Sequence, residues 1–113
     1  MQVVNVSRNL TLVQDLQIAA TFLTRLQGLL GKKEFPQGYG LLIKPCNWVH
    51  TLGMSFPIEV LFLNENLEVI AMERLKPNRF GRPQRSCCAL ELPWGTIDRS
   101  GTILGDKLEI RDF

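Results

Sequence analysis

Short apolar runs separated by turn residues fill much of the sequence after residue 39, and this spacing is the strongest constraint on the fold. The runs lie at 40–43, 58–63, 67–72 and 88–92, and each has the length and composition typical of a β-strand. Residues 64–66, Asn-Glu-Asn, tolerate tight bends, so the second and third runs predict a hairpin. The pattern as a whole predicts an antiparallel sheet.

Further segments complete the predicted fold. Residues 11–18 predict a strand with imperfect alternation, residues 96–100 at most a turn or two of helix, and residues 105–110 a final strand. Residues 21–30 predict the one long helix, because their apolar side chains recur on one helical face. These side chains are Phe22, Leu23, Leu26, Leu29 and Leu30. We therefore predict an α+β, mainly β fold: a small antiparallel sheet curled toward a barrel, with one main α-helix at residues 21–30.

Length, charge and cysteine usage predict an ordinary cytoplasmic domain. The 113 residues contain no repeat or linker, so we expect a single domain over 1–113. A net charge of +2 gives little reason to expect a nucleic-acid partner. No apolar run approaches the roughly 18 residues of a membrane helix, and no secretory signal pattern is visible, so we expect no membrane association. Three cysteines, two of them adjacent, favour reduced thiols.

Three ordered stretches carry a resemblance to a known family. They are "RLQGLLG" at 25–31, "GLLIKPCNWVHTLGMSFPIEVLFLNENLEV" at 40–69, and "LELPWG" followed by Gly-Asp within 90–106. The pattern resembles the family called domain of unknown function 192, an uncharacterised family of bacteria and archaea. The resemblance implies a small, mainly β domain and supplies no reaction. Glu59 departs from the family pattern, which usually has Asp there, so its carboxylate reaches one methylene further.

His50 is the only histidine and the first candidate for chemistry. An imidazole suits a general base or a metal ligand. In an extended chain, however, the side chains of Cys46 and His50 lie about 13 Å apart at roughly 3.3 Å per residue, which argues against a direct Cys–His pair. The competing interpretation is a partly buried histidine whose ring nitrogens bond to the backbone or to a carboxylate. Both interpretations stay open.

A zinc site would need about four ligands, and the sequence offers Cys46, His50, Cys87 and Cys88. Adjacent residues of a strand point to opposite faces, so Cys87 and Cys88 are poorly placed to bind one ion. We expect no metal and no cofactor.

Acidic residues within the motifs are the next candidates. Glu59 and Glu91 each alternate with apolar neighbours in a predicted strand. Two carboxylates on one face would form a polar pocket with His50 and Thr51, or they would line the solvent side of the sheet. Asp106 is predicted to cap the turn that it follows.

The basic segment 73–85 surrounds a single aromatic residue, Phe80. Its cations are Arg74, Lys76, Arg79, Arg82 and Arg85. A basic loop with an aromatic residue is able to bind an anion or RNA, but a single ring offers little surface on which bases stack. The two prolines favour a solvated connector instead.

The sequence thus predicts a cytoplasmic domain that binds a small molecule or a protein partner near residues 46–59. The first alternative is a small enzyme that uses His50 with Glu59 or Glu91 for acid–base chemistry. The second is anion or RNA binding by the basic loop at 74–85. The candidate ligand-binding residues are His50, Thr51, Met54, Glu59, Glu91 and Trp94, and the weaker anion-binding set is Arg74, Lys76, Arg79, Arg82 and Arg85.

Overall fold

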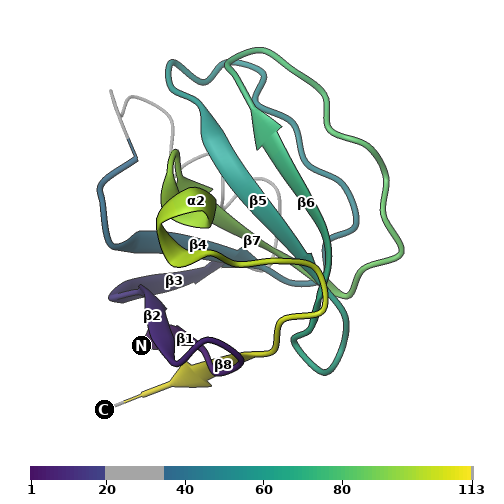
Figure 1. Cartoon of the computed structure of the whole chain (residues 1–113). Helices are drawn as coiled ribbons and strands as arrows, with labels where there is room; N and C mark the ends of the chain where they lie inside the picture. Colours follow the sequence, from purple (N-terminus) through teal and green to yellow (C-terminus); the bar gives the residue numbers. More distant parts are fainter. Residues whose placement is uncertain (20–34, 113) are drawn as a thin grey trace.

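The computed structural model of the chain describes residues 1–19 and 35–112. Within these residues the fold is mainly β, with eight strands and one short helix (Figure 1). This confirms the predicted α+β, mainly β class. The predicted helix at residues 21–30 lies outside the described residues.

A mixed five-stranded sheet forms the larger part of the structure. The hairpin predicted from the short apolar runs is present, and its second strand starts later and extends further than residues 67–72. The strand order is β3 (Asp15–Ala19), β4 (Tyr39–Ile43), β7 (Cys88–Pro93), β5 (Ile58–Leu63) and β6 (Val69–Leu75). All neighbours pair antiparallel except β3 and β4, which run parallel.

A smaller antiparallel sheet lies beside the first. Its order is β2 (Leu10–Val13), β1 (Gln2–Asn5) and β8 (Leu108–Arg111). The smaller sheet approaches the larger one near both edges of the larger sheet. Glu68, before β6, forms a bridge with Lys107, and the Leu16 N–H in β3 donates to the Met1 carbonyl at 2.9 Å. The strands therefore curl around, but they remain two sheets and form no closed barrel.

The single strand predicted at residues 11–18 is two strands in different sheets, β2 and β3. The chain changes sheet between them, where the N–H groups of Gln14 and Asp15 both donate to the Gly38 carbonyl, at 2.8 and 3.0 Å. This bend also makes β3 a parallel neighbour of β4 rather than an antiparallel one. The imperfect alternation of residues 11–18 reflects this change of sheet.

Both faces of the larger sheet are covered, so every residue of β5 and β7 is buried. One face carries Leu61 and Leu90 in a core with the smaller sheet. The opposite face carries Ile58, Val60 and Phe62, which pack with Met54 and Phe56. Continuous burial is the reason why these strands appear as uninterrupted apolar runs.

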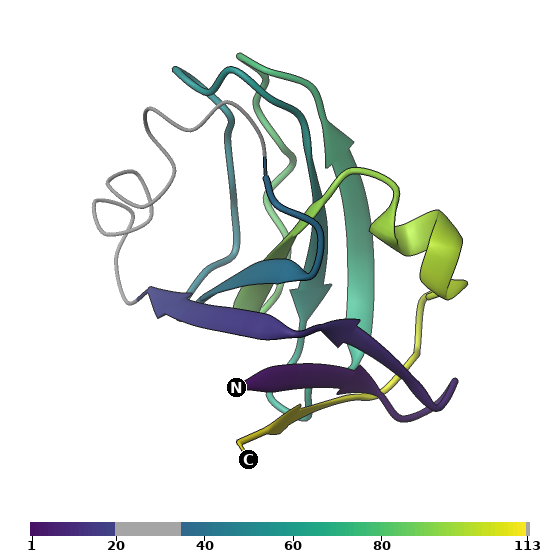
Figure 2. The ribbon, with the colours of Figure 1, turned by 90° about the vertical axis from the view of Figure 1, so that its left-hand side faces the viewer.

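The helix α2 (Thr96–Ser100) coincides with the predicted short helical segment. Gly95 and Gly101 flank it with left-handed backbone angles, φ 95° and 68°, which favour glycine. The N- and C-termini lie on the same side of the molecule as the smaller sheet (Figure 2). No helix among the described residues has the length and apolar character needed to cross a membrane.

Candidate functional site

Two loop segments pair to form an irregular antiparallel ribbon, which we call the pocket ribbon and define as residues 46–51 and 79–87. Main-chain hydrogen bonds join the two segments, and His50 forms an isolated β-bridge with Phe80. The bonds run from Thr51 to Arg79 (2.9 Å), Gly81 to Val49 (2.9 Å), Gln84 to Asn47 (2.7 Å) and Cys46 to Cys87 (3.1 Å), naming the N–H donor first. The segment 46–50 of the predicted site is therefore fixed by the basic loop.

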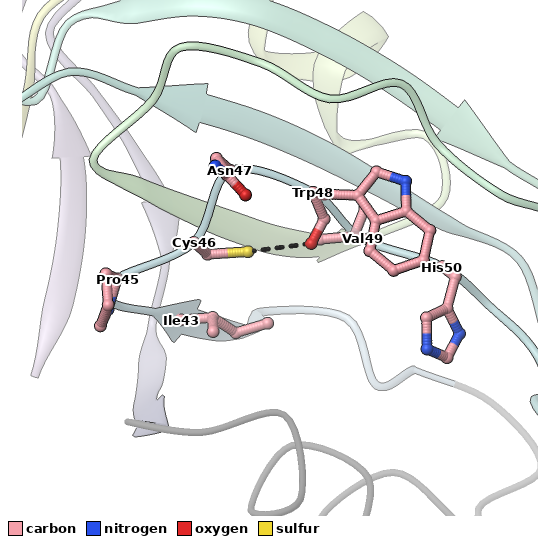
Figure 3. Close-up of a pocket in the computed structure, with 7 residues that line it drawn as sticks. All are labelled: Ile43, Pro45, Cys46, Asn47, Trp48, Val49 and His50. Atoms are coloured by element: carbon pink, nitrogen blue, oxygen red, sulfur yellow. Dashed lines mark hydrogen bonds between the residues drawn. The ribbon is translucent and has the colours of Figure 1, made fainter.

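A pocket with about 350 Å³ of free space opens against the first segment of the ribbon (Figure 3). This volume lies in the range of small-molecule sites. The described lining residues include no Asp, Glu, Lys or Arg. Cys46 and His50 are the ones among them with a titratable side chain. The described lining residues are Ile43, Pro45, Cys46, Asn47, Trp48, Val49 and His50.

Three aromatic rings lie together beside this pocket, and we call Trp48, His50 and Phe80 the aromatic shelf. Trp48 and His50 line the pocket, whereas Phe80 contacts their rings. The Trp48 and Phe80 rings are stacked with centroids 5.9 Å apart and planes 14° from parallel. The His50 ring lies 5.4 Å from Trp48 and 6.3 Å from Phe80. Phe80 is therefore not an isolated ring, as the sequence suggested, but part of a stacking surface.

Main-chain contacts hold the shelf in place. The indole Nε1 of Trp48 donates to the Gly81 carbonyl at 2.9 Å, across 33 positions of sequence. The Nδ1 atom of His50 accepts the Leu52 N–H at 3.1 Å, so in this geometry the neutral ring carries its proton on Nε2. Both rings keep exposed surface, and Trp48 is 39% exposed.

The cysteines occupy different environments. Cys46 lines the pocket, and its thiol donates to the Trp48 carbonyl at 3.2 Å (Figure 3). Cys88 is fully buried in the core, and this burial, with a smaller effect of Cys87, raises the pKa of its thiol to about 12. Within residues 1–19 and 35–112, no group of three or more His, Cys, Asp and Glu side chains is arranged to hold a metal ion.

Glu59 and Glu91 point to opposite faces of the sheet. Glu59 pairs with Leu92 and Glu91 pairs with Val60, so the two carboxylates belong to alternating positions of neighbouring strands. Glu59 is fully buried and accepts hydrogen bonds from Arg74 Nε at 3.1 Å and from the Ile97 N–H at 2.7 Å. The hypothesis that both carboxylates share one pocket with His50 is therefore wrong.

The other predicted site residues are dispersed. Thr51 is fully buried, and its hydroxyl donates to the Lys76 carbonyl at 2.6 Å and accepts the Arg79 N–H at 2.9 Å, which fixes the 76–79 turn. Met54 packs in the core, and Trp94 is exposed after β7, outside the residues that line the pocket. Of the six candidate ligand-binding residues, the structure places only His50 among the described lining residues.

The basic residues divide into two groups. Arg74 forms ion pairs with Glu59 and Asp98. In the described part of the chain, no carboxylate forms an ion pair with the side chain of Lys76, Arg79, Arg82 or Arg85. One carboxylate does lie against this segment, because Glu73 accepts the backbone N–H of Arg82 at 2.8 Å. The Arg79 guanidinium donates to the Pro77 and Asn78 carbonyls of its own turn. The weak anion-binding prediction thus loses Arg74, whereas the other four cations remain exposed on the second segment of the ribbon or just before it.

Comparison with known proteins identifies the family. Residues 3–110 match the family of domain of unknown function 192, described as "Uncharacterized ACR". The chain belongs to this family. The domain of unknown function 192 match agrees with the resemblance seen in the three sequence stretches, and it extends to β1 and β8.

Two relatives agree with this assignment, and one solved structure shares the fold. The chain is 33% identical to a UPF0127 protein of Pyrococcus furiosus, covering 93% of this chain and 94% of that protein. It is 32% identical to a UPF0127 protein of Pyrococcus horikoshii, covering 95% and 96%. A crystal structure of a protein of unknown function from Novosphingobium aromaticivorans has a TM-score of 0.78 at 20% identity, covering 96% of this chain and 82% of that one. This likeness shows a shared fold.

Proposed function

We propose that the chain binds a small, largely apolar molecule in the pocket beside Trp48 and His50. The observation that carries the proposal is a concave site of about 350 Å³ whose walls include Ile43, Val49 and an exposed indole. Pockets that take small molecules are mostly apolar, with a few polar groups that orient the ligand. Here Asn47 and His50 supply such groups.

The enzymatic alternative has less support. Acid–base chemistry needs a carboxylate within hydrogen-bond reach of the histidine or of the reacting atom. Glu59 is engaged by Arg74 and by the start of α2, and Glu91 is fully buried between Leu41 and Val60 in the sheet. A binding role needs neither carboxylate.

Fluorescence titration with N-phenylnaphthylamine, a neutral aromatic probe, tests the proposal. The chain has two tryptophans of similar exposure, Trp48 at 39% and Trp94 at 42%, and only Trp48 is among the lining residues. We expect saturable binding by the wild type, a loss of about tenfold or more in Trp48→Ala, and little change in Trp94→Ala.

The matched pair of variants makes the result decisive. In a Trp94→Phe background, energy transfer to the probe reports only on Trp48 and should persist. The proposal is overturned if the folded wild type shows no saturable binding, or if Trp94→Ala weakens binding as much as Trp48→Ala does.

A further inference from the structure

We propose that the molecule held by this pocket is an anionic compound with a flat ring, whose ring stacks at the aromatic shelf and whose charge meets the arginines of the second ribbon segment. This inference rests on the proposed function and names its ligand class. Its basis is the juxtaposition of a stacking surface, an apolar pocket and exposed arginine side chains that form no ion pair within the described residues.

The distribution of charge is the first observation. Residues 44–58 and 74–90 contain six cations and no Asp or Glu, although the net charge of the whole chain is only +2. Of these cations only Arg74 forms an ion pair in the part of the chain that the structure describes. Lys44, Lys76, Arg79, Arg82 and Arg85 are exposed. The Glu73 carboxylate, just outside these ranges, accepts the Arg82 backbone N–H at 2.8 Å. The three exposed arginines of the pocket ribbon outnumber this one carboxylate, so the ribbon is positively charged.

The pairing of the ribbon places three of these arginines on the segment beside the one that lines the pocket, although none of the three is among the described lining residues. The His50–Phe80 bridge and the hydrogen bond from Gly81 to Val49 place residues 79–85 alongside the segment that lines it. Arg82 and Arg85 follow Phe80 by two and five positions. A guanidinium has a planar set of donors that matches carboxylate, sulfonate or phosphate oxygens.

The stacked rings explain why a flat group is expected beside the charge. Trp48 and Phe80 present a nearly parallel pair next to an apolar hollow, and half-exposed aromatic surface gains free energy when another ring covers it. A compact inorganic anion would use the cations but leave the shelf uncovered. A neutral ring would use the shelf but leave the cations without a partner.

Two probes that share their rings separate these possibilities. Anilinonaphthalene sulfonate carries the aromatic skeleton of N-phenylnaphthylamine plus one sulfonate. We expect the wild type to bind the sulfonate at least about tenfold more tightly. The triple variant Arg79→Gln, Arg82→Gln, Arg85→Gln should lose this preference while it still binds the neutral probe. Arg111→Gln, a control in β8 of the smaller sheet, should keep the preference.

The outcomes are distinct. Equal affinity of the folded wild type for the two probes, or a preference that survives in the triple variant, overturns the anionic class but leaves the pocket proposal standing. Absence of saturable binding by both probes overturns both proposals. Displacement of the sulfonate probe by a thymidine decanucleotide but not by thymidine monophosphate overturns the small-molecule inference in favour of a polyanion.

Discussion

Glu59 and Ile97 lie 38 positions apart in the sequence, yet the buried Glu59 carboxylate accepts the backbone N–H of Ile97 at 2.7 Å. This bond connects the centre of the larger sheet to the first turn of α2, and Arg74 completes the coordination of the carboxylate. Glu59 therefore has a structural role that its position within a family motif did not reveal.

The first prediction concerns this contact. Glu59→Gln should lower the free energy of unfolding by about 1–3 kcal/mol, because the buried charge-assisted bond to Arg74 is lost. Asp98→Asn is the matched control: Asp98 also pairs with Arg74, at 2.7 Å, but its side chain is 80% exposed. Asp98→Asn should lower the free energy of unfolding by well under about 1 kcal/mol. Urea melts that show equal losses would contradict the role assigned to Glu59.

The second prediction compares two residues of the 46–60 segment. Phe56 is buried and packs edge-on against Phe35 with centroids 6.0 Å apart, so Phe56→Ala should cost about 3–5 kcal/mol. His50 is only half-buried, and water is able to replace its bond to Leu52, so His50→Ala should cost less. If urea melts show His50→Ala to be the more damaging change, His50 is chiefly structural and the pocket proposal loses an orienting group.

The third prediction concerns pH. Burial raises the pKa of Asp106, but hydrogen bonds from Asn5 and the Ile103 N–H, together with Arg8, outweigh it and hold the pKa below its ordinary value of 3.8. The donors lie at 3.0, 3.0 and 2.8 Å. The bond from Ile103 is the turn cap expected from the sequence.

Because folding lowers this pKa, the carboxylate stabilises the folded state at pH values above 3.8, and the contribution is lost as the pH falls through the folded value. Asp106→Asn should therefore cost about 1–3 kcal/mol near neutral pH. The difference from the wild type should shrink below pH 3.8. Denaturant melts across this range test the sign, and a difference that grows on acidification would refute it.

The fourth prediction concerns thiol reactivity. Because the thiolate is the reactive form and the pKa of Cys88 is raised to about 12 by burial, Cys88 should not react with a disulfide reagent in the native protein at mildly alkaline pH. The number of thiols per chain that react with the reagent should be lower in the native protein than in urea, where all three cysteines react. A Cys88→Ala variant should change only the count in urea. Rapid reaction of all three thiols in the native protein would show that the Cys88 thiol is not buried.

The fifth prediction concerns metal content. We expect purified protein to carry no stoichiometric zinc, because Cys88 is committed to the core and the thiol of Cys46 bonds to the Trp48 carbonyl. Elemental analysis is the direct measurement. About one zinc per chain, lost on His50→Ala, would show that the ligands are arranged differently.

Local patterns were sufficient to predict the strands whose residues are continuously apolar. The runs at 40–43, 58–63 and 88–92 correspond to β4, β5 and β7, and residues 96–100 form α2. The division of 11–18 between two sheets was not predictable in this way, because it depends on hydrogen bonds to Gly38, far along the chain. β1 was not predicted, because only two of its four residues, Val3 and Val4, are apolar.

The candidate site was predicted only in part, for a similar reason. The segment 46–50 was singled out, but the stacking of Trp48 on Phe80 joins positions that no local pattern connects. Glu59 and Glu91 were predicted as candidates because both are carboxylates within the motifs. Their opposite orientation depends on how β5 pairs with β7, which the sequence pattern does not define. The register of β4 against β7 puts Glu91 on the same face as Ile43, and the register of β5 against β7 puts Glu59 on the opposite face.

Main-chain hydrogen bonds join the two segments of the pocket ribbon, so the course of its backbone depends little on which side chains it carries. The pairing of residues 46–51 with 79–87 uses backbone donors and acceptors at four points, none of which depends on the ring at position 48, 50 or 80. Exchange of the rings at positions 50 and 80 should therefore alter recognition without rebuilding the loops, whereas exchange at position 48 also removes the indole bond to the Gly81 carbonyl. Such a site is suited to evolutionary divergence, and a library randomised at positions 50 and 80 offers a route to new specificities on an unchanged scaffold.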